Sequence, residues 1–91
     1  GATPNNYSLG QNYPNPFNPS TTINFTITNS DFVTLKVYNI LGSEVATLVN
    51  ENLSAGSYKF NFDARNLASG VYLYELNAGN FREIKKMNLL K

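Results

Sequence analysis

Apolar and polar residues alternate along most of this chain, and such alternation is the pattern of half-buried β-strands. Apolar side chains occupy every second position in 22–27 and again in 33–37, with polar side chains between them. The turn-forming run 28–31 separates these segments, so we expect two strands that pair as a hairpin. The same reasoning predicts further strands over 44–49, from Tyr58, from Tyr72 and over 81–90, with one more near Tyr7.

Short strands separated by turn residues, with no segment of helical periodicity, predict an all-β fold. We expect an immunoglobulin-like antiparallel β-sandwich of about seven strands. Val45 and Leu48 are apolar but of opposite parity, which predicts a bulge in the third strand. Ile84 and Met87 show the same change of parity, which predicts a second bulge near the two lysines between them.

Two loops share the pattern Leu-x-x-Gly-x-Tyr, at 53–58 and at 67–72. Each tyrosine begins an apolar set that continues at every second residue. A leucine under the sandwich end and a tyrosine whose hydroxyl bonds back upstream are typical of the tyrosine corner of immunoglobulin-like sandwiches. The repeat therefore supports the sandwich and predicts these two hydroxyl bonds.

A proline-rich segment precedes the first long strand, and we call residues 12–20 the leader. Its prolines fix φ, remove backbone donors and push the preceding residues toward extended conformations. The leader is therefore predicted to be stiff and extended, with Phe17 pinning it to the core. Its structural residues are Tyr13, Pro14, Pro16, Phe17 and Pro19. We divide the chain into a linker, 1–11, and a domain, 12–91, in which the sandwich occupies 21–91.

Composition argues against catalysis. The chain of 91 residues has no histidine and no cysteine, so the commonest general base and the thiolate nucleophile are missing. The acids are isolated in sequence: Asp31, Glu44, Glu51, Asp63, Glu75 and Glu83. Asp63 is expected to cap its loop. A net charge of +1 gives no general attraction to nucleic acid. We predict no catalytic residue, no metal site and no cofactor.

Two sets of residues have both a structural and a functional interpretation. Several of the six tyrosines could line a sugar-binding platform, although inward-facing tyrosines are more often core. Lys85 and Lys86 lie in the last strand, where edge lysines usually prevent pairing between sheets. The alternative is that a partner reads these lysines as a docking signal.

The chain resembles the C-terminal sorting domain of the type IX secretion system, in its type A form. The match begins with Leu9-Gly-Gln-Asn-Tyr-Pro-Asn-Pro-Phe-Asn-Pro-Ser-Thr-Thr-Ile23, which is its most specific part. It continues through 33–42, 44–49, Ala55-Gly56, 62–64 and 67–72, and it ends with Lys85-Lys-Met-Asn-Leu-Leu-Lys91. The resemblance covers about residues 7 to 91.

The resemblance implies a non-catalytic secretion signal of a Gram-negative bacterium. Its N-terminal cargo would pass through the periplasm and cross the outer membrane by the type IX machinery. A sortase-like cysteine protease would then remove the domain, in or ahead of residues 1–8, and leave the cargo anchored at the cell surface or secreted. By this analogy the sorting-signal residues are Gly70, Val71, Tyr72, Lys85, Lys86, Met87, Leu89 and Lys91.

Two other functions remain open at this point. One is an immunoglobulin-like interaction module that stays on the mature protein, similar to the domain of flagellar hook-capping proteins. The other is a small carbohydrate-binding module of a secreted enzyme. An exposed terminal strand also predicts an edge-strand homodimer. Neither nucleic acid nor a membrane-spanning segment is expected.

Overall fold

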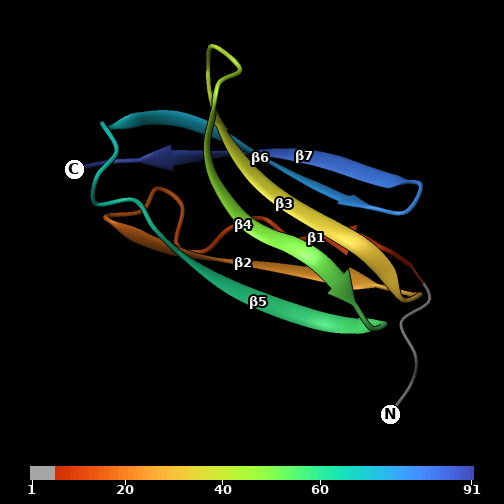
Figure 1. The fold of residues 1–91 in the computed structure, drawn as a ribbon. Helices are drawn as coiled ribbons and strands as arrows, with labels where there is room; N and C mark the ends of the chain where they lie inside the picture. Colours follow the sequence, from red (N-terminus) through yellow and green to blue (C-terminus); the bar gives the residue numbers. More distant parts are fainter. Residues whose placement is uncertain (1–5) are drawn as a thin grey trace.

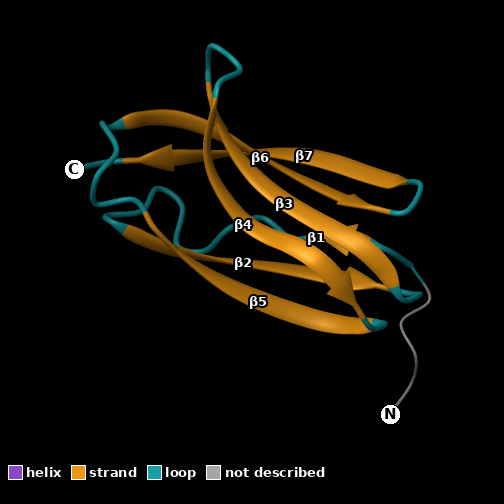
Figure 2. Ribbon diagram, viewed as in Figure 1, coloured by secondary structure: helices purple, strands orange, loops and turns teal. Residues whose placement is uncertain are grey.

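The computed structural model describes residues 6–91 as a sandwich of strands, without a helix in that range (Figure 1). The strands are β1 (Ser8–Leu9), β2 (Ser20–Ile27), β3 (Asp31–Asn39), β4 (Glu44–Leu53), β5 (Gly56–Asp63), β6 (Gly70–Ala78) and β7 (Phe81–Leu89). One antiparallel sheet has the order β1-β2-β5 and the other the order β4-β3-β6-β7. Figure 2 shows a long loop before β2 and shorter connections between the later strands. The predicted all-β sandwich is confirmed, as is the strand near Tyr7.

No helix formed by residues 6–91 has the length and apolar character needed to cross a membrane.

The core lies between the two sheets and consists of the residues that alternate along their strands. The buried set on β2 and β3 is the predicted one: Ile23, Phe25, Ile27, Val33, Leu35 and Val37. Burying each such side chain stabilises the fold by about 1.5–3 kcal/mol. The alternation is therefore the main source of stability in a chain that has no disulfide.

The predicted hairpin between β2 and β3 is wrong, because these strands belong to different sheets. β2 pairs with β1 and β5, whereas β3 pairs with β4 and β6. The connection at 28–30 therefore carries the chain across the sandwich. Both arrangements turn alternate apolar residues toward one core, so the alternation could not distinguish them.

One predicted bulge is present and the other is not. The pairing of β4 with β3 shifts register twice, and the residues passed over are Leu48 and Val45. β7, in contrast, pairs with β6 in one unbroken register. The bulge expected near Lys85–Lys86 is therefore wrong. Ile84 faces outward at 47% exposure, and polar Glu83 takes an inward position instead.

The two Leu-x-x-Gly-x-Tyr loops form the same contact. The hydroxyl of Tyr58 donates to the carbonyl of Ser54 at 2.6 Å, and that of Tyr72 donates to the carbonyl of Ala68 at 2.7 Å. The tyrosines lie at equivalent positions in β5 and β6. Both predicted hydroxyl bonds are confirmed.

The leader is neither helix nor central strand, but it forms a loop instead of an extended strap. Tyr13 and Thr22 exchange backbone hydrogen bonds of 3.0 and 2.9 Å, which close the loop at its base. Phe17 is buried at 2% exposure, with its ring 6.3 Å from that of Phe62, so the predicted anchor is confirmed.

A buried asparagine holds the loop closed from within. Asn12 donates through its amide to Thr21 Oγ1 at 3.0 Å and to the carbonyl of Pro14 at 3.2 Å. Thr21 also donates to that carbonyl, at 2.8 Å. These bonds satisfy polar groups that burial would otherwise leave without partners.

Candidate functional site

Most of the residues expected to carry the sorting signal lie on two paired strands, β6 and β7, toward one end of the four-stranded sheet. Lys85 lies at the middle of β7, opposite Tyr74, and Lys91 follows the strand. Gly70 lies opposite Leu89, and Tyr72 lies opposite Met87. Val71 lies between them at the start of β6. Antiparallel pairing of β6 with β7 therefore brings the Gly-x-Tyr group and the C-terminal group together. We call this region the signal end.

The signal end is the end of the sandwich away from the point where the chain enters it. β1 pairs Ser8 with Thr26, close to the end of β2. At the same end, the hydroxyl of Tyr7 bonds Asp31 and its ring stacks on Phe81, which opens β7. Figure 1 shows the C-terminus on the side opposite to the turn between β6 and β7.

Burial divides seven of the eight expected signal residues into two classes, and Lys85 is intermediate between them. The buried class is Tyr72, Met87 and Leu89. The exposed class is Gly70, Val71, Lys86 and Lys91. In the folded domain a receptor can contact the exposed class, and Lys85 in part. The buried class can affect recognition only through the fold.

The lysines at the end of the chain differ in their surroundings. Lys85 is half-buried, with its ammonium 3.3 Å from Glu83 Oε2. Lys91 is held against the loop before β6, because its backbone N–H donates to Ser69 Oγ at 3.0 Å and its ammonium donates to the carbonyl of Arg65. The ion pair of Lys85 leaves Lys86 and Lys91 as the more exposed charges.

The leader covers the outer edge of β7 at the signal end. The Asn88 N–H donates to Asn15 Oδ1 at 2.9 Å, and the Phe17 N–H donates to the Asn88 carbonyl at 3.0 Å. The Leu90 N–H donates to the Phe17 carbonyl at 2.9 Å. An added strand would need these same backbone groups. The leader therefore takes the place of a neighbouring strand along this half of β7.

A shallow apolar hollow of about 370 Å³ lies where the leader meets the signal end. Its lining comes from the leader, the start of β6 and the end of the chain: Pro16, Ser69, Gly70, Val71, Asn88, Leu89 and Leu90. Three of these residues were expected from sequence to carry the signal. The hollow can receive a small apolar side chain of a partner.

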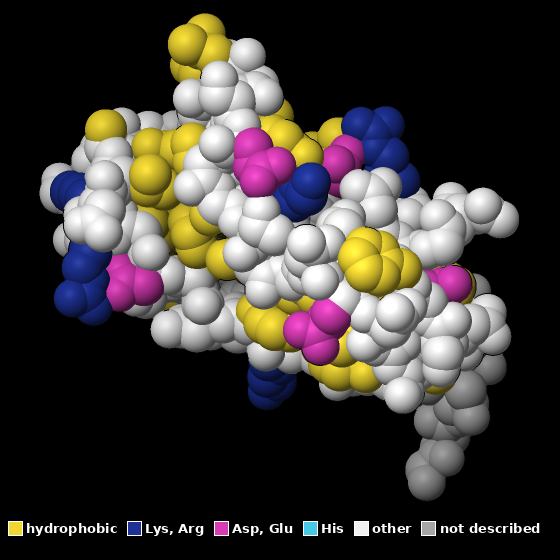
Figure 3. All heavy atoms as spheres, in the orientation of Figure 1, with side chains coloured by type: hydrophobic (Ala, Val, Ile, Leu, Met, Phe, Trp, Pro, Cys, Tyr) yellow, Lys and Arg dark blue, Asp and Glu magenta, His cyan; other side chains and the backbone are white. Residues whose placement is uncertain are grey.

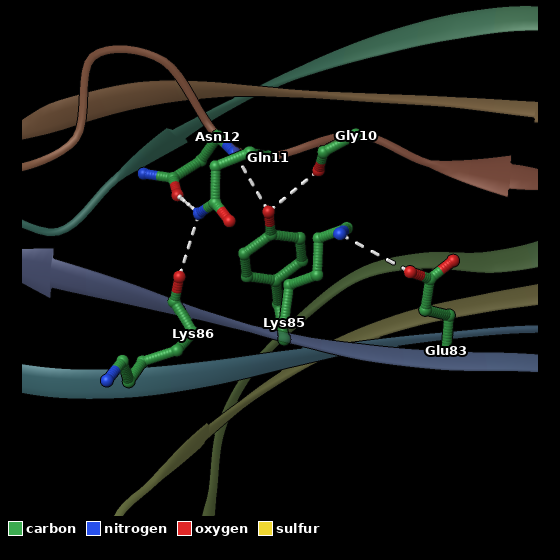
Figure 4. Close-up of polar contacts among 7 residues, drawn as sticks. Gly10, Gln11, Asn12, Glu83, Lys85 and Lys86 are labelled. Atoms are coloured by element: carbon green, nitrogen blue, oxygen red, sulfur yellow. Dashed lines mark hydrogen bonds and ion pairs between the residues drawn. The ribbon is translucent and has the colours of Figure 1, made fainter.

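Tyr74 ties the start of the leader to β6. Its buried hydroxyl donates to the Gly10 carbonyl at 2.7 Å and accepts the Asn12 N–H at 2.8 Å. Between these two residues, Gln11 donates through its side chain to the Lys86 carbonyl at 2.8 Å (Figure 4). Burial raises the pKa of Tyr74 to about 12, so the hydroxyl keeps its proton at neutral pH.

The tyrosines are spread over the molecule instead of forming one platform. Tyr72 and Tyr74 are buried. Tyr58 stacks on Phe25, with ring centroids 5.4 Å apart. Tyr13, at 80% exposure, extends from the leader.

Glu75 is a buried acid on the outer face of the four-stranded sheet. Its Oε1 accepts from Asn77 at 3.1 Å and from Tyr38 at 3.4 Å, and its other oxygen pairs with Arg82. Burial alone would raise the pKa of Glu75, but the hydrogen bonds from these three donors outweigh it and lower the pKa. Both oxygens of this carboxylate are therefore used in contacts within the domain.

Asp63 caps its loop as predicted, since its Oδ1 accepts the Arg65 N–H at 3.0 Å. Within residues 6–91, acids do not gather in a group of three that could hold a metal ion.

Sequence reasoning missed two features that bear on recognition. One is a pair of side-chain amides that bind the backbone of β7, that of Gln11 just before the leader and that of Asn15 within it. The other is the apolar pair Ile40 and Leu41, which the turn between β3 and β4 exposes at 71% and 86%. Two adjacent aliphatic residues inside a turn were a signal for the second feature, because a turn this short cannot bury them.

A family model described as secretion system C-terminal sorting domain matches residues 11–89 of the chain. A comparison with curated proteins gives no significant match.

Proposed function

Because the chain belongs to the family of secretion system C-terminal sorting domains, we propose that it is a non-catalytic signal for type IX secretion. It directs the cargo on its N-terminal side across the outer membrane. The cargo then reaches the cell surface or the medium of a Gram-negative bacterium. The direct partner of the domain is the type IX machinery at the outer membrane.

The convergence of most of the expected signal residues toward one end of the sandwich supports this proposal. Gly70 and Val71 line a hollow with Leu89, and exposed Lys86 lies on the strand that forms one side of it. This end is opposite to the end where the chain enters the fold. A receptor can therefore engage the signal end while cargo is attached at the other end.

The signal is read on the folded domain. An extended reading of residues 86–90 would have to remove Phe17 from the core and break the bonds of the leader with Asn88 and Leu90. It would also separate β7 from β6. A receptor that binds the folded domain breaks none of these contacts, and it can contact the exposed class of signal residues.

Removal by a sortase-like cysteine protease is the next step of the proposal. The expected cleavage segment, 1–8, lies mostly outside the described residues. Ser8 and Leu9 are paired with β2 in a sheet, and Leu9 is buried. A protease needs an extended, accessible backbone, so the cut falls ahead of Ser8 and leaves the domain 12–91 and its linker separate from the cargo.

An edge-strand homodimer through β7 would have only part of this strand available. Among described residues, the leader bonds the edge at Asn88 and Leu90, whereas Arg82 and Ile84 have no backbone partner on that side. Light scattering over a range of concentrations tests this pairing, and a monomer throughout would contradict it.

The test of the main proposal is export of a periplasmic reporter fused ahead of residues 1–91, in a host that has a type IX system. Deletion after Ile84 is unsuitable because it removes buried Met87 and Leu89. The test variant is instead Lys86→Glu with Lys91→Glu. The matched control is Lys59→Glu, which reverses an exposed charge on β5 in the other sheet.

The reporter carrying the unchanged domain should appear outside the cell. The double variant should be exported roughly tenfold more slowly, and the control should be exported normally. The melting temperatures of the three isolated domains (unchanged, double variant and control) should agree within a few degrees. Retention of the unchanged fusion in the periplasm would contradict the sorting function. Normal export of the double variant would contradict only the role of the two lysines.

A further inference from the structure

The hairpin between β3 and β4 projects beyond the rest of the sandwich, and its tip is apolar. Figure 1 shows the turn standing clear of both sheets, and Figure 3 shows hydrophobic side chains at the outermost point of the same projection. The side chains at the tip are Ile40 and Leu41, exposed at 71% and 86%. Single exposed apolar residues are common, but an adjacent pair at the end of a projection is typical of an interaction site.

The tip is held rigidly by the residue at its base. Asn39 Oδ1 accepts the N–H groups of Leu41 and Ser43, both at 3.0 Å. The Gly42 N–H donates to the Asn39 carbonyl at 3.0 Å, and Gly42 adopts a φ of 88° that favours glycine. A turn fixed in this way loses little conformational entropy on binding, which favours recognition.

The charges near the tip are neutralised within the domain. Residues 39–43 include no charged side chain. At the base of the hairpin, Lys36 pairs with Glu44 at 3.4 Å. Binding to an anionic membrane surface would call for free lysine or arginine and for aromatic residues beside the aliphatic pair. The complementary surface is therefore an uncharged, apolar pocket on a protein.

A second copy of the domain does not suit this feature. Two aliphatic side chains cover much less than the roughly 800 Å² per partner of a standard interface. The tip is too small to hold a dimer by itself, but it is suited to fill a pocket of a larger receptor that also contacts the sheet.

The sheet beside the tip connects it with the signal end. Asn39 pairs with Tyr72, so the hairpin begins next to the Gly-x-Tyr group. Val71 and Leu73 lie two residues apart on the outer face of β6, between the signal end and the foot of the hairpin. At the foot of the hairpin is a hollow of about 300 Å³, lined by Tyr38, Gly42, Leu73, Glu75, Arg82 and Ile84. One continuous face therefore runs from the signal end to the tip.

We infer that Ile40 and Leu41 form a docking knob that enters an uncharged apolar pocket on a protein of the type IX machinery at the outer membrane. The inference rests on the proposed function. It adds a contact that lies outside the expected signal residues. The receptor contacts the outer face of β6 and β7 and receives the tip at the same time.

The test uses the reporter fusion with residues 1–91 and replaces both tip residues, Ile40→Ser with Leu41→Ser. Because both side chains are exposed, the melting temperature should stay within a few degrees of the original. Export should slow by about tenfold or more, since each aliphatic side chain contributes substantially when buried. The aliphatic exchange Ile40→Leu with Leu41→Ile should keep export. Phe32→Ser, which removes an apolar side chain exposed at 53% near the other end of β3, should also leave export unchanged.

A photo-crosslinking residue in place of Leu41 identifies the occupant in secreting cells. An adduct with an outer-membrane component of the type IX system, together with loss of export in the serine variant, would support the inference. If both the serine variant and the unchanged fusion are exported normally, the docking role of Ile40 and Leu41 is refuted and the sorting function is not. Retention of the unchanged fusion would overturn both. Binding of the domain to phosphatidylglycerol vesicles that depends on the tip would overturn the protein pocket in favour of lipid.

Discussion

Replacement of Phe17 by alanine is predicted to destabilise the whole domain and to free the end of β7. Phe17 is 2% exposed, packs near Phe62 and accepts the Leu90 N–H through its carbonyl. The substitution leaves the backbone bonds available but removes the side chain that holds the leader in place. Its effect should therefore be largest at the signal end.

The expected loss is large relative to the total stability. Truncation of a buried phenylalanine to alanine costs about 3–5 kcal/mol. A chain of 91 residues has a free energy of unfolding of roughly 5–14 kcal/mol at ~0.05–0.15 kcal/mol per residue. The melting temperature of a domain this small falls by about 4–8 °C per kcal/mol. We therefore expect a decrease of at least about 12 °C.

Urea unfolding followed by near-ultraviolet circular dichroism measures this loss, since the chain has tyrosine and phenylalanine but no tryptophan. Tyr13→Ala is the matched control, because Tyr13 is an aromatic residue of the same leader at 80% exposure. It should cost less than about 0.5 kcal/mol. Hydrogen exchange at the Leu90 amide should accelerate in Phe17→Ala only. A loss below about 1 kcal/mol for Phe17→Ala, or equal losses for both variants, would refute the anchoring role of Phe17.

Three further predictions concern the tyrosines and Glu75. Because the pKa of Tyr74 is raised from 10.0 to about 12, its stabilising effect is complete below pH 10 and is lost as the pH rises toward 12. That loss is roughly 2–3 kcal/mol of the free energy of unfolding. When the free energy of unfolding is measured between about pH 9 and pH 12, Tyr74→Phe should lack this decrease. The same dependence on pH in the variant and the unchanged protein would contradict the prediction. Tyr72→Phe should lower the free energy of unfolding by about 1 kcal/mol and Tyr58→Phe by less, because the Tyr58 hydrogen bond is exposed. A larger decrease in melting temperature for Tyr58→Phe than for Tyr72→Phe would contradict this prediction. Arg82→Met should raise the pKa of Glu75 in an NMR titration, since a donor that lowers this pKa is removed; an unchanged pKa would show that the other donors suffice.

The alternation of residues predicted the core well because the buried apolar positions of β2, β3 and β6 are those that the alternation marks. It could not predict which strands pair, since β2 and β3 would present the same faces to the core in a hairpin or in opposite sheets. Pairing depends on contacts between strands far apart in sequence. The repeated loops succeeded for a different reason, because each tyrosine reaches a carbonyl only four residues upstream.

The errors in β7 and in the leader share a physical cause. β7 is an edge strand, and its inward positions near the open side of the sandwich tolerate Glu83 and Lys85 as an ion pair. An apolar residue on such a strand can face outward, as Ile84 does, without any bulge. In the leader, local proline geometry predicted stiffness, but the path of the chain is set by side-chain amides such as that of Asn12, which bind atoms several residues away. Neither effect is visible in a local pattern.

The arrangement of leader and last strand also bears on how mutations in the signal should be interpreted. Loss of export after Met87→Ala or Tyr72→Ala would follow from a weakened fold, because both side chains are buried inside the folded domain. Loss after Val71→Ser or Lys86→Glu, with unfolding unchanged, would point to contact, because these side chains are exposed. If the signal were read as an extended strand, destabilising Phe17→Ala would make residues 86–90 more available and export faster. If it is read on the folded face, the same substitution slows export in proportion to the unfolded fraction, so the direction of this one change separates the two mechanisms.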